Sequence, residues 1–197
     1  MTAVRPTIAG HLAIMRVDHW FKNVFVLPGI AVALSVLPDP MADLRGHLVR
    51  VVVGLVSICL VASSNYTINE LLDAPFDLHH PTKSSRPVPA GLVHPTLAYV
   101  QWLVLMALGV GLGLWISPAY ATTVGVLWLM GCIYNIPPLR SKDLPYLDVL
   151  SESVNNPLRM LAGWYSIGAE VVPPASLLLS YWMIGAYFMA MIRQGRH

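Results

Sequence analysis

Six apolar stretches alternate with short polar connections along the chain. They cover residues 20–37, 48–68, 96–116, 119–136, 147–167 and 172–192. A helix of about 20 residues crosses the hydrocarbon core of a bilayer, and each stretch is close to that length. Only helices and closed barrels satisfy backbone groups in lipid, and these stretches are too long for barrel strands. The pattern predicts an all-α, polytopic bundle of six transmembrane helices.

The composition agrees with a membrane protein and narrows its chemistry. Only 11% of the 197 residues are charged, against about a quarter in soluble domains. The net charge is +2 and the basic residues form no stripe, so no nucleic-acid partner is predicted. Cys59 and Cys132 lie in apolar stretches without the spacing of a disulfide or a metal site. We expect both thiols to serve packing.

The basic residues are distributed unevenly between the two sides that six spans would create. Arg45 and Arg50 fall on one side, and Arg159 lies within the fifth span. The other side holds Arg5, Arg16, Lys22, Lys83, Arg86, Arg140, Lys142, Arg193 and Arg196. Because Lys and Arg concentrate on the cytoplasmic side of membrane proteins, both termini are predicted to be cytoplasmic. The predicted location is the plasma membrane, as in the inner membrane of a bacterium.

A polar motif closes the second apolar stretch. Asn69, Asp73 and Asp77 recur every fourth residue, and Lys83 and Arg86 follow. Positions four apart share one face of a helix, and carboxylates at the mouth of a span are usually functional. Oxygen ligands suit Mg²⁺ shared with a phosphate-bearing substrate, whose oxygens Lys and Arg can hold. The alternative is a solvated helix end at the membrane interface.

A proline interrupts this motif. Pro75 disfavours helix at the preceding residue and clashes with the carbonyl four residues back. The helix is therefore predicted to end or kink near Leu72 or Asp73. Asp77 would then project from a loop or a restarted turn.

The fifth apolar stretch carries a second polar pattern. Asp148, Glu152, Asn155 and Arg159 are spaced four, three and four residues apart, which places them on one helical stripe. A polar stripe within a span faces the bundle interior or a wet cavity. It can be an internal salt bridge that joins helices. It can also be a cavity wall that faces the aspartate motif, with Arg159 holding an anionic substrate.

The segment before this stretch adds two more cations at the membrane interface. Pro137 and Pro138 end the fourth span, and Arg140 and Lys142 follow them. Ordinary anchoring of the span explains both cations. Phosphate binding is compatible with the same position.

These motifs resemble a known family. The Asn69–Asp73–Asp77 spacing, with Lys83 and Arg86 downstream, resembles the first aspartate-rich motif of the UbiA superfamily of intramembrane prenyltransferases. The opening formed by Arg16, Trp20, Lys22 and Asn23 resembles the branch that includes decaprenyl-phosphate phosphoribosyltransferase, as do residues 134–142 and 148–163. The resemblance covers about residues 16–190.

The resemblance implies a nine-helix bundle around a cavity that opens to lipid, with Mg²⁺ holding a departing diphosphate. In most members an allylic cation then alkylates an acceptor. In the phosphoribosyl branch the donor is phosphoribosyl diphosphate and the acceptor a polyprenyl phosphate. The implied partners of this chain are a diphosphate donor and a polyprenyl lipid, and the implied cofactor is Mg²⁺.

The motifs and the resemblance together give the predicted site. The predicted metal ligands are Asn69, Asp73 and Asp77, and the predicted catalytic residues are Asp73, Asp77 and Arg159. The predicted substrate-binding residues are Lys22, Asn69, Lys83, Arg86, Arg140, Lys142, Glu152 and Asn155.

One departure from the family concerns the end of the chain. The resemblance implies a second acidic motif after the sixth helix and three further helices, whereas residues 191–197 hold no acid. We therefore expect residues 1–197 to form a single, incomplete transmembrane domain with little activity alone. The alternatives are a truncated, non-catalytic homologue, and a small ion-coupled transporter using Asp148, Glu152 and Arg159.

Overall fold

The structure is a computed structural model that describes residues 5–169 and 171–194, with side chains up to residue 191. All regular elements of the described chain are helices, joined by turns and loops. Its elements are α1 (Ile8–Ala13), η1 (Val17–Phe25), α2 (Val26–Val36), α3 (Leu44–Asp77), η2 (Lys83–Ser85), α4 (Pro95–Ile116), α5 (Pro118–Asn135), η3 (Ser141–Asp143), α6 (Leu147–Ser153), α7 (Asn155–Ser166) and α8 (Ala175–Gln194).

The all-α prediction is confirmed, and each of the six apolar stretches coincides with helix. The first stretch comprises η1 and α2, and the fifth comprises α6 and α7. Within the described residues, three helical segments are long and apolar enough to cross a membrane individually, namely Ile8–Val36, Leu44–Asp77 and Pro95–Ile116. The segment without acids, residues 191–197, ends in residues 195–197, which include Arg196 and lie outside the described residues.

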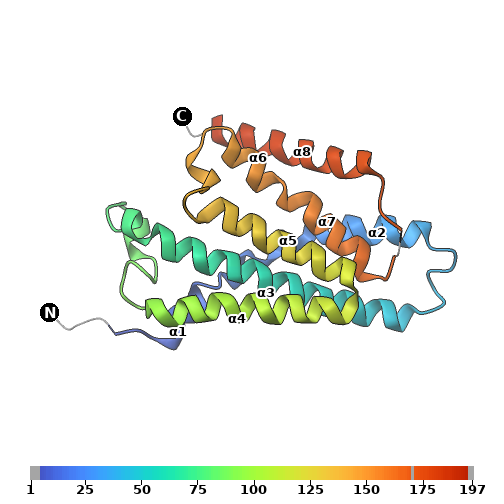
Figure 1. Ribbon diagram of the computed structural model, residues 1–197, viewed down its shortest axis with the longest axis horizontal. Coiled ribbons are helices and arrows are strands. Elements are labelled where there is room, and N and C mark those ends of the chain that lie inside the picture. Colours follow the sequence, from blue (N-terminus) through green and yellow to red (C-terminus); the bar gives the residue numbers. More distant parts are fainter. Residues whose placement is uncertain (1–4, 170, 195–197) are drawn as a thin grey trace.

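The helices run back and forth along one direction, so that the connections gather at two ends (Figure 1). One end holds α1, the α3–α4 connection with η2, and the α5–α6 connection with η3. The other end holds the α2–α3 connection, the α4–α5 turn at Ser117 and the α7–α8 connection. The aspartate motif and the cations of residues 83–86 and 140–142 thus share one end of the bundle.

Close helix packing holds the bundle together. Helix α3 packs on α4 and α5, and α2 packs on α7. A methyl group on Gly29 would overlap the carbonyl oxygen of Met160, and one on Gly163 would overlap that of Val26. Small residues let membrane helices approach this closely, which increases dispersion contacts between them. The central apolar core includes the fully buried Ile58 and Val124.

The prediction that Pro75 ends the helix is wrong. Helix α3 continues through Pro75, and Asp77 is its last residue. The proline lies in the final turn, so it removes a single backbone donor there. Leu78 N–H then donates to the carbonyl oxygen of Ala74 at 3.1 Å and closes the turn. Asn69, Asp73 and Asp77 consequently follow one another on a continuous helix.

The prediction of one four-residue polar stripe is wrong in part. The fifth span divides at Val154 into α6 and α7. Pro157 lacks the N–H that a continuous helix would direct at the carbonyl of Ser153, and it sits instead in the first turn of α7, where prolines are tolerated. Asp148 is buried beside its own backbone, with Oδ1 accepting from the N–H of Val149 at 2.6 Å.

Candidate functional site

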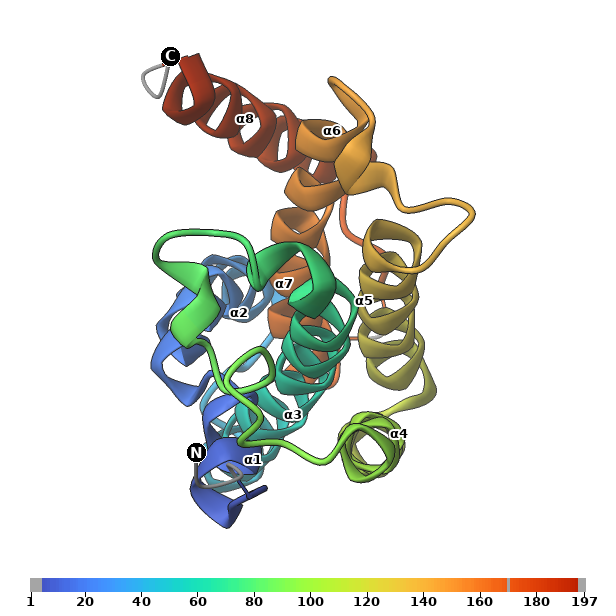
Figure 2. The ribbon, with the colours of Figure 1, turned by 90° about the vertical axis from the view of Figure 1, so that its left-hand side faces the viewer.

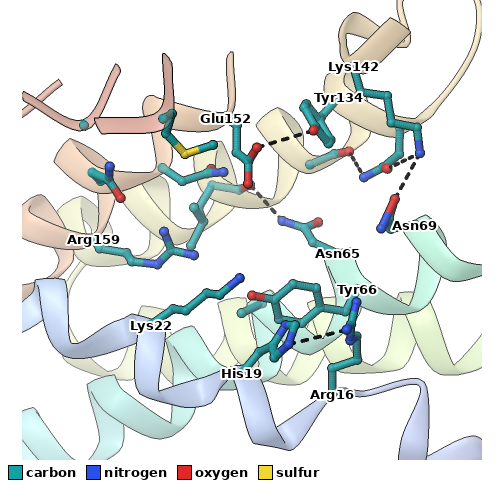
Figure 3. Close-up of a pocket in the computed structure, with 18 of the residues that line it drawn as sticks. Arg16, His19, Lys22, Asn65, Tyr66, Asn69, Tyr134, Lys142, Glu152 and Arg159 are labelled. Atoms are coloured by element: carbon teal, nitrogen blue, oxygen red, sulfur yellow. Dashed lines mark hydrogen bonds between the residues drawn. The ribbon is translucent and has the colours of Figure 1, made fainter. Parts of the chain in front are cut away.

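A cavity of about 760 Å³ lies between η1, α3, α5, α6, α7 and α8 (Figure 3). Nine of the predicted site residues line it: Lys22, Asn69, Asp73, Lys83, Arg86, Lys142, Glu152, Asn155 and Arg159. Asp77 and Arg140 do not line it, and neither does Asp148. The two polar patterns of the sequence therefore face a common space, as predicted for a cavity wall. Of the three residues on which the transporter alternative rests, Glu152 and Arg159 line the cavity and Asp148 does not.

Three side-chain oxygens converge on one ammonium group at the α3 side of the cavity. The Nζ of Lys142 donates to Oδ1 of Asp73 at 2.6 Å, to Oδ1 of Asn135 at 2.9 Å and to Oδ1 of Asn69 at 3.0 Å. A lysine ammonium has three donors, so each N–H has its own acceptor. We call the three oxygens of Asn69, Asp73 and Asn135 the oxygen cage.

Burial and hydrogen bonding have opposite effects on the pKa of Lys142. Its side chain is only 10% exposed, and burial lowers the pKa of its amine. The hydrogen bond to Asp73 acts in the opposite direction and raises that pKa. Burial has the larger effect, so the pKa lies below its ordinary value, and the hydrogen bond to the Asp73 carboxylate limits that shift.

Arg140 stands behind Asp73, outside the cavity. Its Nη2 lies 3.0 Å from Oδ1 of Asp73 and its Nε lies 2.6 Å from Oδ2 of Asp143. The guanidinium also sits 5.1 Å from the ring centre of Phe76. Arg140 therefore neutralises Asp73 from outside the cavity.

Asp77 has a different environment from the two motif residues before it. It is 3% exposed, and its Oδ2 accepts from Nη1 of Arg86 at 2.7 Å. Its other oxygen lies 3.9 Å from Nζ of Lys83. Because Lys83 and Arg86 both line the cavity, Asp77 holds two cations at the cavity rim.

The α7 side of the cavity is also polar. Lys22, Glu152 and Arg159 converge there, opposite Asn69 and Lys142 (Figure 3). The Nε of Arg159 donates to Oδ1 of the buried Asn23 at 3.0 Å, which fixes the guanidinium. Glu152 Oε2 accepts from the hydroxyl of Tyr134 at 3.5 Å.

Two acceptors in this cavity lack a hydrogen bond. Among the described residues, the buried Oδ1 atoms of Asn65 and Asn155 have no protein partner. Both residues line the cavity. A buried acceptor without a partner costs free energy, so these atoms favour a ligand or water that donates hydrogen bonds.

An apolar edge completes the cavity. Phe25 of η1 and Tyr181, Ile184, Phe188 and Met189 of α8 line this edge. Figure 2 shows α8 set apart from α2 and α3, and α8 packs against α6 and α7. Ile184 and Phe188 are more than half exposed, so this edge offers apolar surface to a hydrocarbon chain.

The chemistry of the oxygen cage fits a magnesium ion that is shared with a ligand. In the described part of the chain, no three His, Cys, Asp or Glu side chains come close enough to hold a metal alone. Mg²⁺ prefers oxygen and is commonly bound by one or two carboxylates plus substrate phosphates. Asn69, Asp73 and Asn135 supply oxygens that already surround a cation. Asp77, the remaining predicted ligand, is engaged with Arg86.

Sequence reasoning missed several cavity residues. Asn65 precedes Asn69 by four residues, so the same helical spacing could have found it. Tyr66 precedes Asn69 by three residues and shares the same helical face. Asn135 carried no such signal, because the packing of α5 against α3 brings it to the cavity. Arg16, His19 and Asn156 also line it.

Fold and site together define an integral membrane helical bundle with a cation-lined cavity suited to phosphates. The chain matches the UbiA prenyltransferase family over residues 23–194. It belongs to this family, as its resemblance to the superfamily predicts.

Curated relatives and solved structures agree with this assignment. The chain is 31% identical, over 92% of its length, to decaprenyl-phosphate phosphoribosyltransferase of Corynebacterium glutamicum, and 29% identical to that of Mycolicibacterium smegmatis over 93%. It covers 52% and 55% of these proteins, and thus spans about half their length. A UbiA homolog from Archaeoglobus fulgidus bound to DMAPP and Mg²⁺ superimposes with a TM-score of 0.74 at 26% identity, covering 90% of this chain and 60% of that one.

Proposed function

We propose that this chain carries the diphosphate-binding part of an integral-membrane, Mg²⁺-dependent transferase. The enzyme would move a group from a diphosphate donor to an acceptor, one of the two being a polyprenyl lipid. The observation that carries this proposal is the oxygen cage of Asn69, Asp73 and Asn135 around a cation. The family assignment and the Mg²⁺-bound solved relative support it.

The oxygen cage would bind the metal of a metal–diphosphate pair, and the cations at the cavity rim would bind the diphosphate oxygens. Mg²⁺, when bound, would neutralise charge that develops on the departing diphosphate. Asp73 would bind that metal, and Lys83 and Arg86 at the rim would hold phosphate oxygens. Asp77 would act through Arg86, which it orients at 2.7 Å.

The polar α7 side favours a sugar-bearing donor. Its Glu152 carboxylate and the unpartnered Oδ1 of Asn155 are acceptors that suit hydroxyl groups, as is the unpartnered Oδ1 of Asn65 on α3. An isoprenoid chain would leave them unsatisfied, whereas the apolar edge at α8 suits such a chain. We therefore favour phosphoribosyl transfer to a polyprenyl phosphate, the reaction in the names of the two relatives.

The proposed reaction replaces one bond at the ribose carbon with another. The bond between the ribose carbon and the diphosphate oxygen breaks, and a bond from that carbon to an acceptor phosphate oxygen forms. Lys22 and Arg159 would hold the anionic acceptor on the α7 side. Asn23 would keep the Arg159 guanidinium in place for this contact.

The active face is proposed to be cytoplasmic. The end of the bundle that holds the aspartate motif also carries Lys83, Arg86, Arg140 and Lys142. Single cysteines in residues 78–82, in a variant lacking Cys59 and Cys132, should react with impermeant reagents only from the cytoplasmic side.

Equilibrium binding of labelled phosphoribosyl diphosphate tests the proposed function. With the chain in lipid nanodiscs, binding should require Mg²⁺, vanish with a chelator and fall in Asp73→Asn. Asp143→Asn is a matched control, because Asp143 is exposed and contacts Arg140 rather than the cavity. Equal binding with and without Mg²⁺, or full binding by the Asp73 variant, would contradict the proposal.

A further inference from the structure

We propose that Lys142 is a tethered counter-cation that fills the oxygen cage until a metal ion replaces it, and that Asn135 is a third oxygen ligand of that metal. The inference rests on the proposed function, because it concerns the same cavity. It adds an occupant of the cage in its resting state and a ligand from α5, which neither the aspartate motif nor its spacing contains.

The geometry of the cage argues for a cation site rather than an incidental contact. Its oxygens come from two helices, and the three distances to Nζ span only 2.6–3.0 Å. Asn135 is 3% exposed, and its Nδ2 donates to the carbonyl oxygen of Gly131 at 2.9 Å. This bond fixes the amide orientation and directs Oδ1 at the shared cation.

Lys142 and the cage differ in how firmly each is held. Asn69 and Asp73 are on α3 and Asn135 ends α5, so all three oxygens are held by helices. Lys142 belongs to the short η3 segment in the α5–α6 connection, and its ammonium stands on a flexible four-carbon stem. The ammonium can therefore leave while the oxygens stay in place.

Competition between Lys142 and a metal follows from distance. Mg²⁺ requires its oxygen ligands at about 2.0–2.1 Å, so it cannot share the same three oxygens with an ammonium group. Without any cation, Oδ1 of the buried Asn135 would lose the donor that Lys142 supplies. Lys142 therefore stabilises the cage when no metal is bound, and it opposes the entry of a metal ion. Once displaced, its charge remains in the cavity, where phosphates would be.

Arg140 provides a matched control for charge. It contacts Asp73 at 3.0 Å, as Lys142 does at 2.6 Å, but no hydrogen bond joins it to Asn69 or Asn135 among the described residues. It also lies outside the cavity lining. Removing either cation changes the net charge beside Asp73 equally, whereas only removal of Lys142 empties the cage.

Binding of Mn²⁺ alone, measured by electron paramagnetic resonance on the chain in nanodiscs, tests the proposal. Lys142→Met should tighten Mn²⁺ binding about tenfold or more, because the metal then no longer has to displace the ammonium group from its hydrogen bonds with the cage oxygens. Arg140→Met should change it by less than about threefold, since Arg140 hydrogen-bonds to Asp73 alone among the cage residues and its removal leaves the Lys142 ammonium in place. Asn135→Ala should weaken binding in the Lys142→Met background.

Each outcome decides a part of the proposal. Equal tightening in Lys142→Met and Arg140→Met would overturn the occupancy of the cage by Lys142, while leaving the proposed function intact. Unchanged Mn²⁺ affinity on adding Asn135→Ala would overturn its role as a ligand. No Mn²⁺ binding by any variant, even with diphosphate present, would overturn the proposed function as well.

Amine labelling provides a readout that needs no variant. In the wild-type chain, Mg²⁺ without any phosphate should expel the ammonium from the cage. Acetylation of Lys142, followed by mass spectrometry, should then become several-fold faster. Lys83, whose side chain is 45% exposed, should label at the same rate with and without the metal. A Lys142 rate that Mg²⁺ leaves unchanged would overturn the proposal.

Discussion

The Nζ of Lys142 lies 2.6 Å from Oδ1 of Asp73, a residue 69 positions earlier in the chain. This contact joins the end of α3 to the α5–α6 connection and closes one wall of the cavity. It also means that Asp73 is already neutralised, by Lys142 within the cavity and by Arg140 behind it. Any metal that binds Asp73 must do so in competition with these cations.

The environment of Asp77 leads to a prediction that separates two roles for this residue. If Asp77 orients Arg86, then Asp77→Asn should weaken diphosphate binding by about tenfold, since a buried charge pair loses one partner. The affinity for Mn²⁺ alone should stay within about twofold of the wild type, because Asp77 does not line the cavity. Titration calorimetry with each ligand measures both. A large loss of Mn²⁺ affinity would instead show that Asp77 is a metal ligand.

The unpartnered oxygen of Asn155 predicts selectivity for the sugar. Asn155→Leu keeps the size of the side chain but removes its acceptor. We expect the affinity for phosphoribosyl diphosphate to fall by roughly tenfold, because a ribose hydroxyl would lose its hydrogen bond. Inorganic diphosphate, which has no ribose, should bind the variant and the wild type equally. Equal losses for both ligands would contradict a sugar-binding role for Asn155.

The close contact of α2 with α7 predicts where the bundle tolerates no added volume. Gly163→Ala places a methyl group against the carbonyl oxygen of Val26, and we expect it to destabilise the fold by about 1–3 kcal/mol. Gly111→Ala is the matched control, because nothing lies within 4 Å of the added methyl group. Thermal unfolding in detergent should show a lower midpoint for the first variant alone. Equal midpoints would contradict the packing account.

The sequence supported the helical fold and two of the three residues of the oxygen cage. Apolar stretches of span length predicted the helices, and spacing by four put Asn69 and Asp73 on one face. The position of Asn135 depends on how α5 packs against α3, which the local pattern does not encode. Asp148 lies on α6 with Glu152, and four-residue spacing alone does not show that Glu152 lines the cavity while Asp148, one turn earlier, does not. Asp77 was predicted in a loop or a restarted turn because the rule for prolines was applied without regard to the position of Pro75 in the last helical turn.

Hyperfine coupling between Mn²⁺ and phosphorus tests the central claim most directly. The chain in nanodiscs would be loaded with Mn²⁺ and inorganic diphosphate, and electron–nuclear double resonance would detect phosphorus bonded through oxygen to the metal. We predict a ³¹P coupling in the wild-type chain that is lost in Asp73→Asn and retained in Asp143→Asn. Bound Mn²⁺ without ³¹P coupling, or a coupling that survives Asp73→Asn, would contradict the claim that this cavity holds a metal–diphosphate pair.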